Sequence, residues 1–135
     1  MSLASDVLAV LPVLRAEAES LMIDTCTITR PGDSVTDPDS GVVTPGTTPV
    51  YSGKCKVQSK DSATSTPEAG EAVFVVVSRQ IHIPVGAADV RNDDVVTVTA
   101  SVLNPFGVGR RYRVEGFTPD SYDTAARIPV KEITL

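Results

Sequence analysis

The chain has 135 residues, a formal net charge of −5, and a composition that is 41% hydrophobic and 21% charged. One domain of this length buries enough surface to fold without disulfides or bound metals. The acidic excess excludes a surface that grips nucleic acid everywhere, because non-specific binding depends on Lys and Arg displacing counterions from phosphates. It does not exclude a surface past which DNA slides.

The N-terminal segment predicts an amphipathic helix over residues 5–22, with Ser5 and Asp6 as capping residues. Pro12 either kinks this helix or begins a second one. Four small or apolar residues then recur at helical spacing and form a stripe: Leu14, Ala18, Leu21 and Met22. The stripe packs either on the domain's own sheet or on a neighbouring subunit, and the sequence does not choose between these alternatives.

The apolar run at 7–14 invites comparison with a signal peptide. No positive charge precedes it, Pro12 interrupts it, and it is too short to span a bilayer. We therefore expect an intracellular protein that is soluble and has no membrane contact.

From residue 24 onward the apolar residues follow the period of two that is typical of strands. Strands are expected at 24–30, 51–58, 72–85, 95–100, 108–117 and 126–135. Residues 31–50, with four prolines and three glycines, predict a long hairpin arm that leaves the body and turns at 37–41. The run 73–77 is apolar on both faces and predicts a central strand covered on both sides. One helix and about six short antiparallel strands predict a single mainly β domain, 1–135, built as a small barrel or sandwich.

Little in the sequence points to catalysis. His82, the single histidine, lies in a strand without a metal-ligand neighbour, which favours a packing or surface role. Residues 89–94, "DVRNDD", are the best metal candidate, but they lack the glycine and the distal glutamate of an EF-hand loop. Cys26 and Cys55 occupy alternating strand positions and are expected to be small buried thiols, with a bridge possible if their strands pair. We expect no enzyme activity and no cofactor.

Three arginines cluster near the C-terminal part of the chain, at positions 110, 111 and 113. Arg110, Arg111 and Arg113 suit contact with nucleic acid, an acidic neighbouring subunit, or solvent on an ordinary strand face. With Tyr112 as the one aromatic residue among them, DNA recognition is weakly supported, and an inter-subunit salt-bridge face suits them at least as well.

The segment "SKDSATSTPEAGEA", residues 59–72, contains no Val, Ile, Leu, Met or aromatic residue. Ordering a backbone costs about 1–2 kcal/mol per residue, and this segment has little apolar surface to offset that cost. We expect a loop that is mobile in an isolated subunit. It is either functional or an outward-facing surface loop.

Taken in order, several segments resemble the head-to-tail connector proteins of long-tailed bacteriophages, in particular the head-closure or stopper group. The segments are "IDTCTITRP", "DPDSG", "YSGKCKVQ", "HIPVGAADVRNDDVVTVT", "VGRRYRVEGF" and "ARIPVKEI". The resemblance covers about residues 11–135 and rests on the order and spacing of the segments, since no single motif is diagnostic. It implies a small β-barrel that assembles as a ring below the portal and its adaptor, extends the DNA channel and docks the tail.

The resemblance also assigns roles to residues. It places a loop that projects into the channel and helps retain packaged DNA at 59–72, with these candidate residues: Lys60, Asp61, Ser65, Glu68 and Glu71. Candidate contacts with a neighbouring subunit or ring are Arg110, Arg111, Arg113, Leu14 and Leu21, with Asp37 and Asp39 in the hairpin arm.

The expected partners follow from the same resemblance. They are other copies in a homo-oligomeric ring, the portal and adaptor complex, tail terminator or tail tube proteins, and double-stranded DNA that passes non-specifically through the lumen. The expected location is the virion, assembled in the host cytoplasm. The alternatives are another ring of the joint (adaptor or tail terminator) or a non-catalytic β-sandwich binding module, which six aromatic residues without Trp make less favourable.

Overall fold

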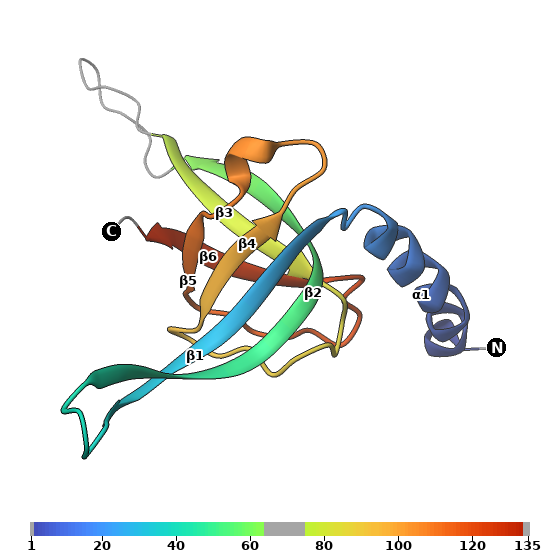
Figure 1. Ribbon diagram of the computed structural model, residues 1–135. Helices are drawn as coiled ribbons and strands as arrows, with labels where there is room; N and C mark the ends of the chain where they lie inside the picture. Colours follow the sequence, from blue (N-terminus) through green and yellow to red (C-terminus); the bar gives the residue numbers. More distant parts are fainter. Residues whose placement is uncertain (1, 64–74, 134–135) are drawn as a thin grey trace.

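The computed structural model describes residues 2–63 and 75–133 (Figure 1). In these residues an N-terminal helix is followed by six strands and one short 3-10 helix. The elements are α1 (Leu3–Ser20), β1 (Asp24–Thr36), β2 (Val43–Ala63), β3 (Val75–Ile83), β4 (Val95–Ala100), η1 (Pro105–Gly107), β5 (Arg111–Val114) and β6 (Ala126–Ile133).

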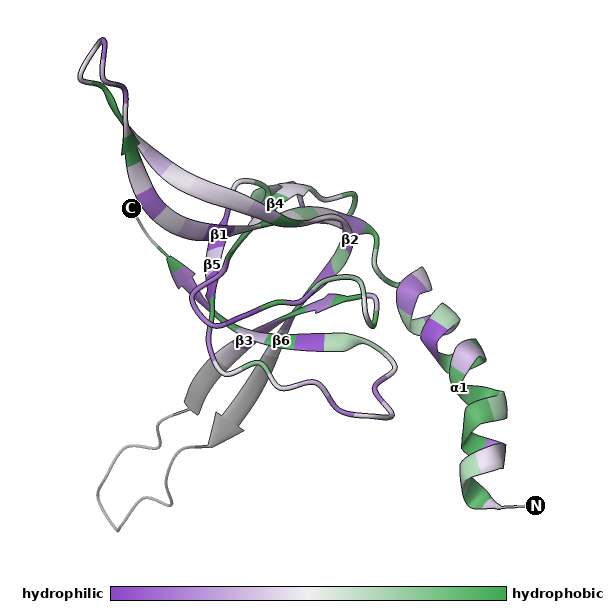
Figure 2. Cartoon of the chain, turned by 90° about the horizontal axis from the view of Figure 1, so that it is seen from below, coloured by the Kyte–Doolittle hydropathy of each residue, from purple (hydrophilic) through white to green (hydrophobic). Residues whose placement is uncertain are grey.

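The strands close into an antiparallel barrel in the order β1-β2-β3-β6-β5-β4. Pairing between β1 and β4 completes the cylinder, so each strand has a hydrogen-bonded neighbour on both sides within the barrel. In this order β1 lies opposite β6 and β2 lies opposite β5. Figure 2 shows β1 and β6 on opposite sides of the barrel. The predicted mainly β fold with an N-terminal helix is confirmed, in its barrel form.

The alternation of the strand sequences fills the barrel interior. Ile28, Ile81, Val96, Tyr112 and Ile128, from five different strands, are each no more than 1% exposed. The interior is therefore packed with side chains, as expected for a barrel of few strands.

The helix α1 begins two residues earlier than predicted. Ser2 is its N-cap, and the Ser2 hydroxyl accepts a hydrogen bond from the Ser5 N–H at 3.2 Å. The prediction that Ser5 and Asp6 cap the helix is therefore wrong, because Ser2 is extended and its oxygen reaches the first turn. Pro12 lies inside one continuous helix, which excludes a second helix start there.

Strands β1 and β2 are longer than the barrel requires, and their surplus forms the predicted hairpin arm, residues 31–50. Pro31 pairs with Thr47, and Thr36 pairs with Val43. The arm leaves the barrel as a ribbon (Figure 1, lower left), and residues 31–45 are exposed throughout. The predicted arm is confirmed.

The reversal of the arm is built by hydrogen bonds of its own backbone. The Asp37 N–H donates to the Val42 carbonyl at 2.9 Å, and the Gly41 N–H donates to the Asp37 carbonyl at 2.8 Å. Gly41 has a φ of 73°, which glycine adopts without steric cost. The tip therefore has a defined shape without help from the barrel.

The segment predicted as a polar loop is partly strand. β2 continues to Ala63 and pairs with β3, from Ser59 opposite Arg79 to Ala63 opposite Val75. The loop prediction for 59–72 is wrong for its first five residues, because their backbone groups pair with β3 in the ladder. The ladder between β3 and β6 begins only at Arg79. The described part of the run 73–77 is therefore not a central strand, since β2 is its strand partner.

The strand predicted at 108–117 is shorter than expected. β5 spans only Arg111–Val114, because Gly109 and Gly116 adopt φ values of 87° and 78° that end the extended backbone on either side. β3 also ends earlier than predicted, at Ile83, where Pro84 opens a turn closed by the Ala87 N–H.

Candidate subunit-contact surfaces

An ion pair between a partly exposed arginine and a buried carboxylate joins the base of the hairpin arm to the barrel. Arg30, the residue before the arm, donates to both carboxylate oxygens of Asp94: Nε to Oδ1 at 3.0 Å and Nη2 to Oδ2 at 3.1 Å. Asp94 is 1% exposed and also accepts from the Arg91 N–H at 2.8 Å. The hydrogen bond to Asp94 raises the pKa of Arg30 above its ordinary value. This two-point contact orients the base of the arm.

The carboxylates of segment 89–94 all have basic partners nearby. Besides the Arg30–Asp94 pair, Asp89 Oδ2 lies 3.0 Å from Arg91 Nη2, and Asp93 Oδ1 lies 4.0 Å from Arg113 Nε. No group of three or more metal-ligating side chains comes together within 2–63 and 75–133. The three acids lie close together in the sequence, but in the fold each one lies beside a different arginine.

The tip of the hairpin arm is acidic and partly apolar. Asp33, Asp37 and Asp39 are exposed, and residues 31–50 contain no Lys or Arg. The Asp37 carboxylate accepts from the Asp39 N–H at 2.9 Å, and this bond and the Ser40 hydroxyl lower the pKa of Asp37. Three valines of the tip are more than half exposed: Val35 at 65%, Val42 at 59% and Val43 at 60%. Asp37 and Asp39, predicted as contact residues, thus lie at a charged and exposed end.

The predicted arginine cluster is divided by the fold. Arg110 precedes β5 and pairs with Glu132, Nη1 to Oε1 at 2.7 Å. Arg111 and Arg113 lie on the outer face of β5, because Tyr112 and Val114 occupy the buried positions between and after them. Arg113 also pairs with Glu115, Nη2 to Oε1 at 2.9 Å, and this hydrogen bond raises its pKa.

Lys131 joins this outer face from β6, directly opposite Arg113 in the strand register. Sequence reasoning missed it, because the alternation of 126–135 shows which face Lys131 occupies but not which strand lies beside it. Arg111, Arg113 and Lys131 form what we call the basic wall. Like charges directly opposite each other on adjacent strands are unfavourable, so this wall favours an anionic neighbour.

Helix α1 touches the barrel through few groups and leaves apolar side chains exposed. Leu11 and Met22 are buried, whereas Leu14 is 43% and Leu21 is 60% exposed. The Arg15 Nε–H donates to the Asp123 carbonyl at 3.0 Å. Figure 2 shows that the N-terminal half of α1 is mostly hydrophobic. Of the predicted stripe, Met22 is therefore buried, whereas Leu14 and Leu21, the two residues predicted to contact a neighbour, are exposed.

A second exposed apolar surface lies where α1 meets the loop between β4 and β5. Leu21, Ile23 and Leu103 line a groove of about 380 Å³ there. Val102 and Phe106 in the same loop are 77% and 84% exposed. Large apolar residues this exposed, lying close together, are typical of protein–protein contact sites.

The predicted channel-loop residues are only partly described. Lys60 and Asp61 lie in β2, opposite Ser78 and Val77 of β3. Ser65, Glu68 and Glu71 lie outside the described residues. The hairpin that leads to them extends from the opposite end of β2 to the one that carries the arm (Figure 1).

His82 is buried on the outer side of the barrel wall. It is 7% exposed, and its register neighbours are Lys56 in β2 and Arg127 in β6. Burial, followed by the positive charges of Lys56 and Arg127, lowers the pKa of His82 to about 4. Its Nε2 lies 3.4 Å from Gln80 Oε1. A neutral imidazole in this position fits the packing role that the sequence predicted.

Cys26 and Cys55 are free thiols in the barrel core. Both are fully buried, on neighbouring strands that pair Cys26 with Gly53 and Cys55 with Asp24. A hydrogen bond with Cys26 and burial raise the pKa of Cys55. The predicted buried thiols are confirmed, and the alternative of a bridge between them is not.

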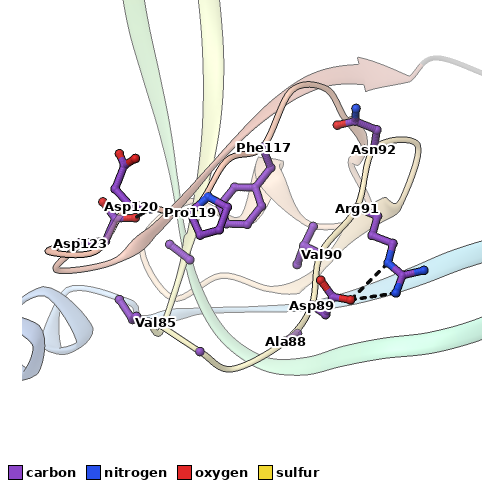
Figure 3. A pocket seen from close by; sticks show the side chains of 12 residues that line it. Val85, Ala88, Asp89, Val90, Arg91, Asn92, Phe117, Pro119, Asp120 and Asp123 are labelled. Carbon is purple, nitrogen blue, oxygen red and sulfur yellow. Dashed lines mark hydrogen bonds and ion pairs between the residues drawn. The ribbon is translucent and has the colours of Figure 1, made fainter.

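The loops 85–92 and 117–126 enclose a pocket of about 450 Å³ (Figure 3). Its lining combines apolar side chains such as Val90 and Phe117 with the carboxylates of Asp89, Asp120 and Asp123. Asp89 is paired with Arg91, and Asp123 Oδ2 accepts from the Asp120 N–H at 2.9 Å. These bonds stabilise the two loops that form the pocket.

None of the described helices is both long and apolar enough to cross a membrane. The comparison with protein families gives one match, to the family of unknown function DUF6093, over residues 14–131. Since this match covers most of the chain, the chain belongs to that family. Neither the curated proteins nor the solved structures contain a match.

Proposed function

We propose that this member of DUF6093 is a structural protein of the head–tail joint of a long-tailed bacteriophage. In this proposal, copies form a ring below the portal and adaptor, extend the DNA channel, help retain packaged DNA and dock the tail. The proposal rests on the resemblance of the ordered segments to the head-closure group, to which the barrel fold is well suited.

The observation that carries the proposal is that β2 leaves the closed barrel at both ends. One end forms the hairpin arm with β1, and the other forms a ribbon with β3 that leads to residues 64–74. A barrel whose interior is filled gains nothing in its own stability from two such ribbons, since a two-stranded ribbon is marginal in water. Projections of this kind suit a subunit that reaches its neighbours on one side and the channel on the other.

The exposed apolar surfaces support the same conclusion. Leu14 and Leu21 on α1, together with Leu103 and Phe106 on the β4–β5 loop, lie open to solvent. Exposed apolar patches that have no function are costly for a soluble monomer, because they promote aggregation. Symmetric association of copies covers them.

The acidity of the chain suits a ring through which DNA moves. A net charge of −5 provides little attraction for phosphates over most of the surface. A channel built from such subunits lets DNA pass without holding it. Retention then depends on obstruction by projecting segments rather than on affinity.

Electron microscopy of tailless heads tests the proposal. We expect the chain to form the lowest ring of the neck, with density that crosses or narrows its lumen at the position of residues 59–72. Particles made without the chain should package DNA and then lose it. A chain absent from the particles would overturn the proposal. A ring found instead on isolated tails would assign it to the tail terminator.

A further inference from the structure

The hairpin arm and the basic wall lie on opposite sides of one barrel. The arm grows from β1 and β2, and the basic wall lies on β5 and β6. In the strand order of the barrel, β1 is opposite β6 and β2 is opposite β5. Two different surfaces on opposite sides of a subunit are the arrangement that joins copies head to tail, and such contacts close into rings when the rotation permits.

The two surfaces are complementary in charge. The arm carries Asp33, Asp37 and Asp39 and no basic residue, and all three carboxylates are exposed. The wall carries three cations, of which Arg111 and Lys131 form no ion pair within the described residues. Since Arg113 stands opposite Lys131, an anion that settles between them removes a repulsion within the subunit.

Apolar groups accompany the charges on both surfaces. Val35, Val42 and Val43 are exposed at the arm tip. In the loop that leads into β5, Phe106 is 84% and Val108 is 45% exposed, and the Arg110 Nε–H donates to the Phe106 carbonyl at 3.1 Å. A contact that pairs charges and also covers apolar surface is more specific than charge alone.

The arm projects well beyond the barrel, as such a contact requires. From Pro31 to Thr36 an extended strand spans roughly 20 Å, at about 3.3 Å per residue. The Arg30–Asp94 ion pair fixes its base, and the Asp37 turn defines its tip. The arm therefore carries its carboxylates away from the barrel on a turn of defined shape.

We propose that the acidic tip of the hairpin arm docks on the basic wall of the next copy of this chain, and that this contact repeats head to tail around the ring. The inference rests on the self-association in the proposed function and names the surfaces that make it. The occupant of the wall is thus a second copy, not nucleic acid.

Charge reversal on each surface gives a direct test. The arm variant carries Asp33→Lys and Asp39→Lys, which leave the turn-forming Asp37 in place. The wall variant carries Arg111→Glu and Lys131→Glu, which leave the Arg113–Glu115 pair in place. Each variant repels its own copies. In an equal mixture, each arm faces an oppositely charged wall, so alternating copies fit together.

Sedimentation velocity and native mass spectrometry are run up to millimolar concentration in low salt. We expect the wild type to associate, each variant alone to associate at least about tenfold more weakly, and the mixture to recover most of the loss. High salt should weaken the wild-type contact. Asp120→Lys in the loop between β5 and β6 and Arg127→Glu at the other end of β6 are matched controls that should associate like the wild type. Circular dichroism verifies that each variant is folded.

A variant that leaves the charges unchanged tests the geometry of the arm. A Cβ at Gly46 collides with the carbonyl oxygen of Asp33 on the facing strand. Gly46→Ala should therefore distort the arm and weaken association while the barrel stays folded. Gly32→Ala, whose Cβ lies 3.5 Å from the nearest atom, is the control.

Three results would overturn the docking: variants that associate like the wild type, a mixture that recovers nothing, or a wild type that stays monomeric throughout. Microscopy separates this failure from failure of the proposed function. If chains with a charge-reversed arm or wall still form the neck ring, the proposed function stands and the proposed docking contact is rejected. A chain that associates by this contact but is missing from particles removes the function and leaves the docking.

Discussion

The barrel and the hairpin arm share the strands β1 and β2 but differ in how those strands are stabilised. Within the barrel, Cys26, Ile28 and Cys55 of these strands have no exposed surface. In the arm, residues 31–45 of the same strands are exposed throughout. Burial of apolar surface is the main favourable term in folding. The folding free energy therefore resides in the barrel, whereas the surface of the arm remains available for contacts.

The largest expected effect on the free energy of unfolding comes from comparing a buried residue of the barrel with an exposed residue of the arm. Ile81→Ala removes a fully buried side chain from β3 and should lower the free energy of unfolding by about 3 kcal/mol, since Ile→Ala in cores costs roughly 2–5 kcal/mol. Val43→Ala at the arm tip, where Val43 is 60% exposed, should change it by less than about 0.5 kcal/mol. Urea denaturation followed by circular dichroism measures both. Comparable losses would show that the arm contributes to the folding core.

The second effect concerns the joint between the two regions. Arg30→Ala leaves the Asp94 carboxylate, 1% exposed, without its partner. Removing one partner of a buried charge leaves the other charge uncompensated, so we expect Arg30→Ala to destabilise the protein clearly, although less than a fully buried pair would, because Arg30 is itself 32% exposed. The barrel and the arm base should both be affected, because β4 begins beside Asp94.

Arg91→Ala is the matched control for this joint. Arg91 pairs with Asp89, but their side chains are 64% and 78% exposed. Exposed pairs contribute roughly 0–1 kcal/mol, so Arg91→Ala should be nearly neutral. The same denaturation assay compares the two variants. If Arg30→Ala proves no more harmful than Arg91→Ala, the buried pair does not hold the arm to the barrel.

The barrel was predictable from the sequence because its signal is local. Alternation in segments such as 24–30 and 95–100 identifies strands and their inward faces, and the proline and glycine content of 31–50 identifies the arm. These features depend only on residues close together in the chain.

Features set by strand pairing could not be predicted in this way. The Arg30–Asp94 pair joins residues 64 positions apart, and Lys131 meets Arg113 only because β6 lies beside β5. Residues 59–63 resembled a loop because they contain no large apolar residue, whereas their place in a strand depends on pairing with β3, which is distant in the sequence. The sequence therefore identified Arg111 and Arg113 without the lysine that completes their surface.

The last expected effect is a dependence of stability on pH that arises in the barrel, at His82, and not in the arm. The pKa of His82 is lowered from 6.5 to about 4 in the folded barrel. Between about pH 4 and pH 6.5, the imidazole therefore binds a proton more readily in the unfolded chain than in the folded one. The stability that this group contributes is present above pH 6.5 and is lost progressively as the pH drops from 6.5 toward 4. In the arm, the pKa of Asp37 is lowered from its ordinary value, so this carboxylate keeps its charge across the same window.

His82→Gln isolates this contribution, because glutamine is neutral at every pH in the window and retains hydrogen-bonding capacity near Gln80. Urea denaturation at several pH values between 6.5 and 4 should show a shallower loss of stability in His82→Gln than in the wild type. Carboxylates titrate alike in both proteins, so the difference between the two curves reports the imidazole. Parallel curves would mean that His82 is solvated in the folded state, and that its side of the barrel wall is as open to water as the arm.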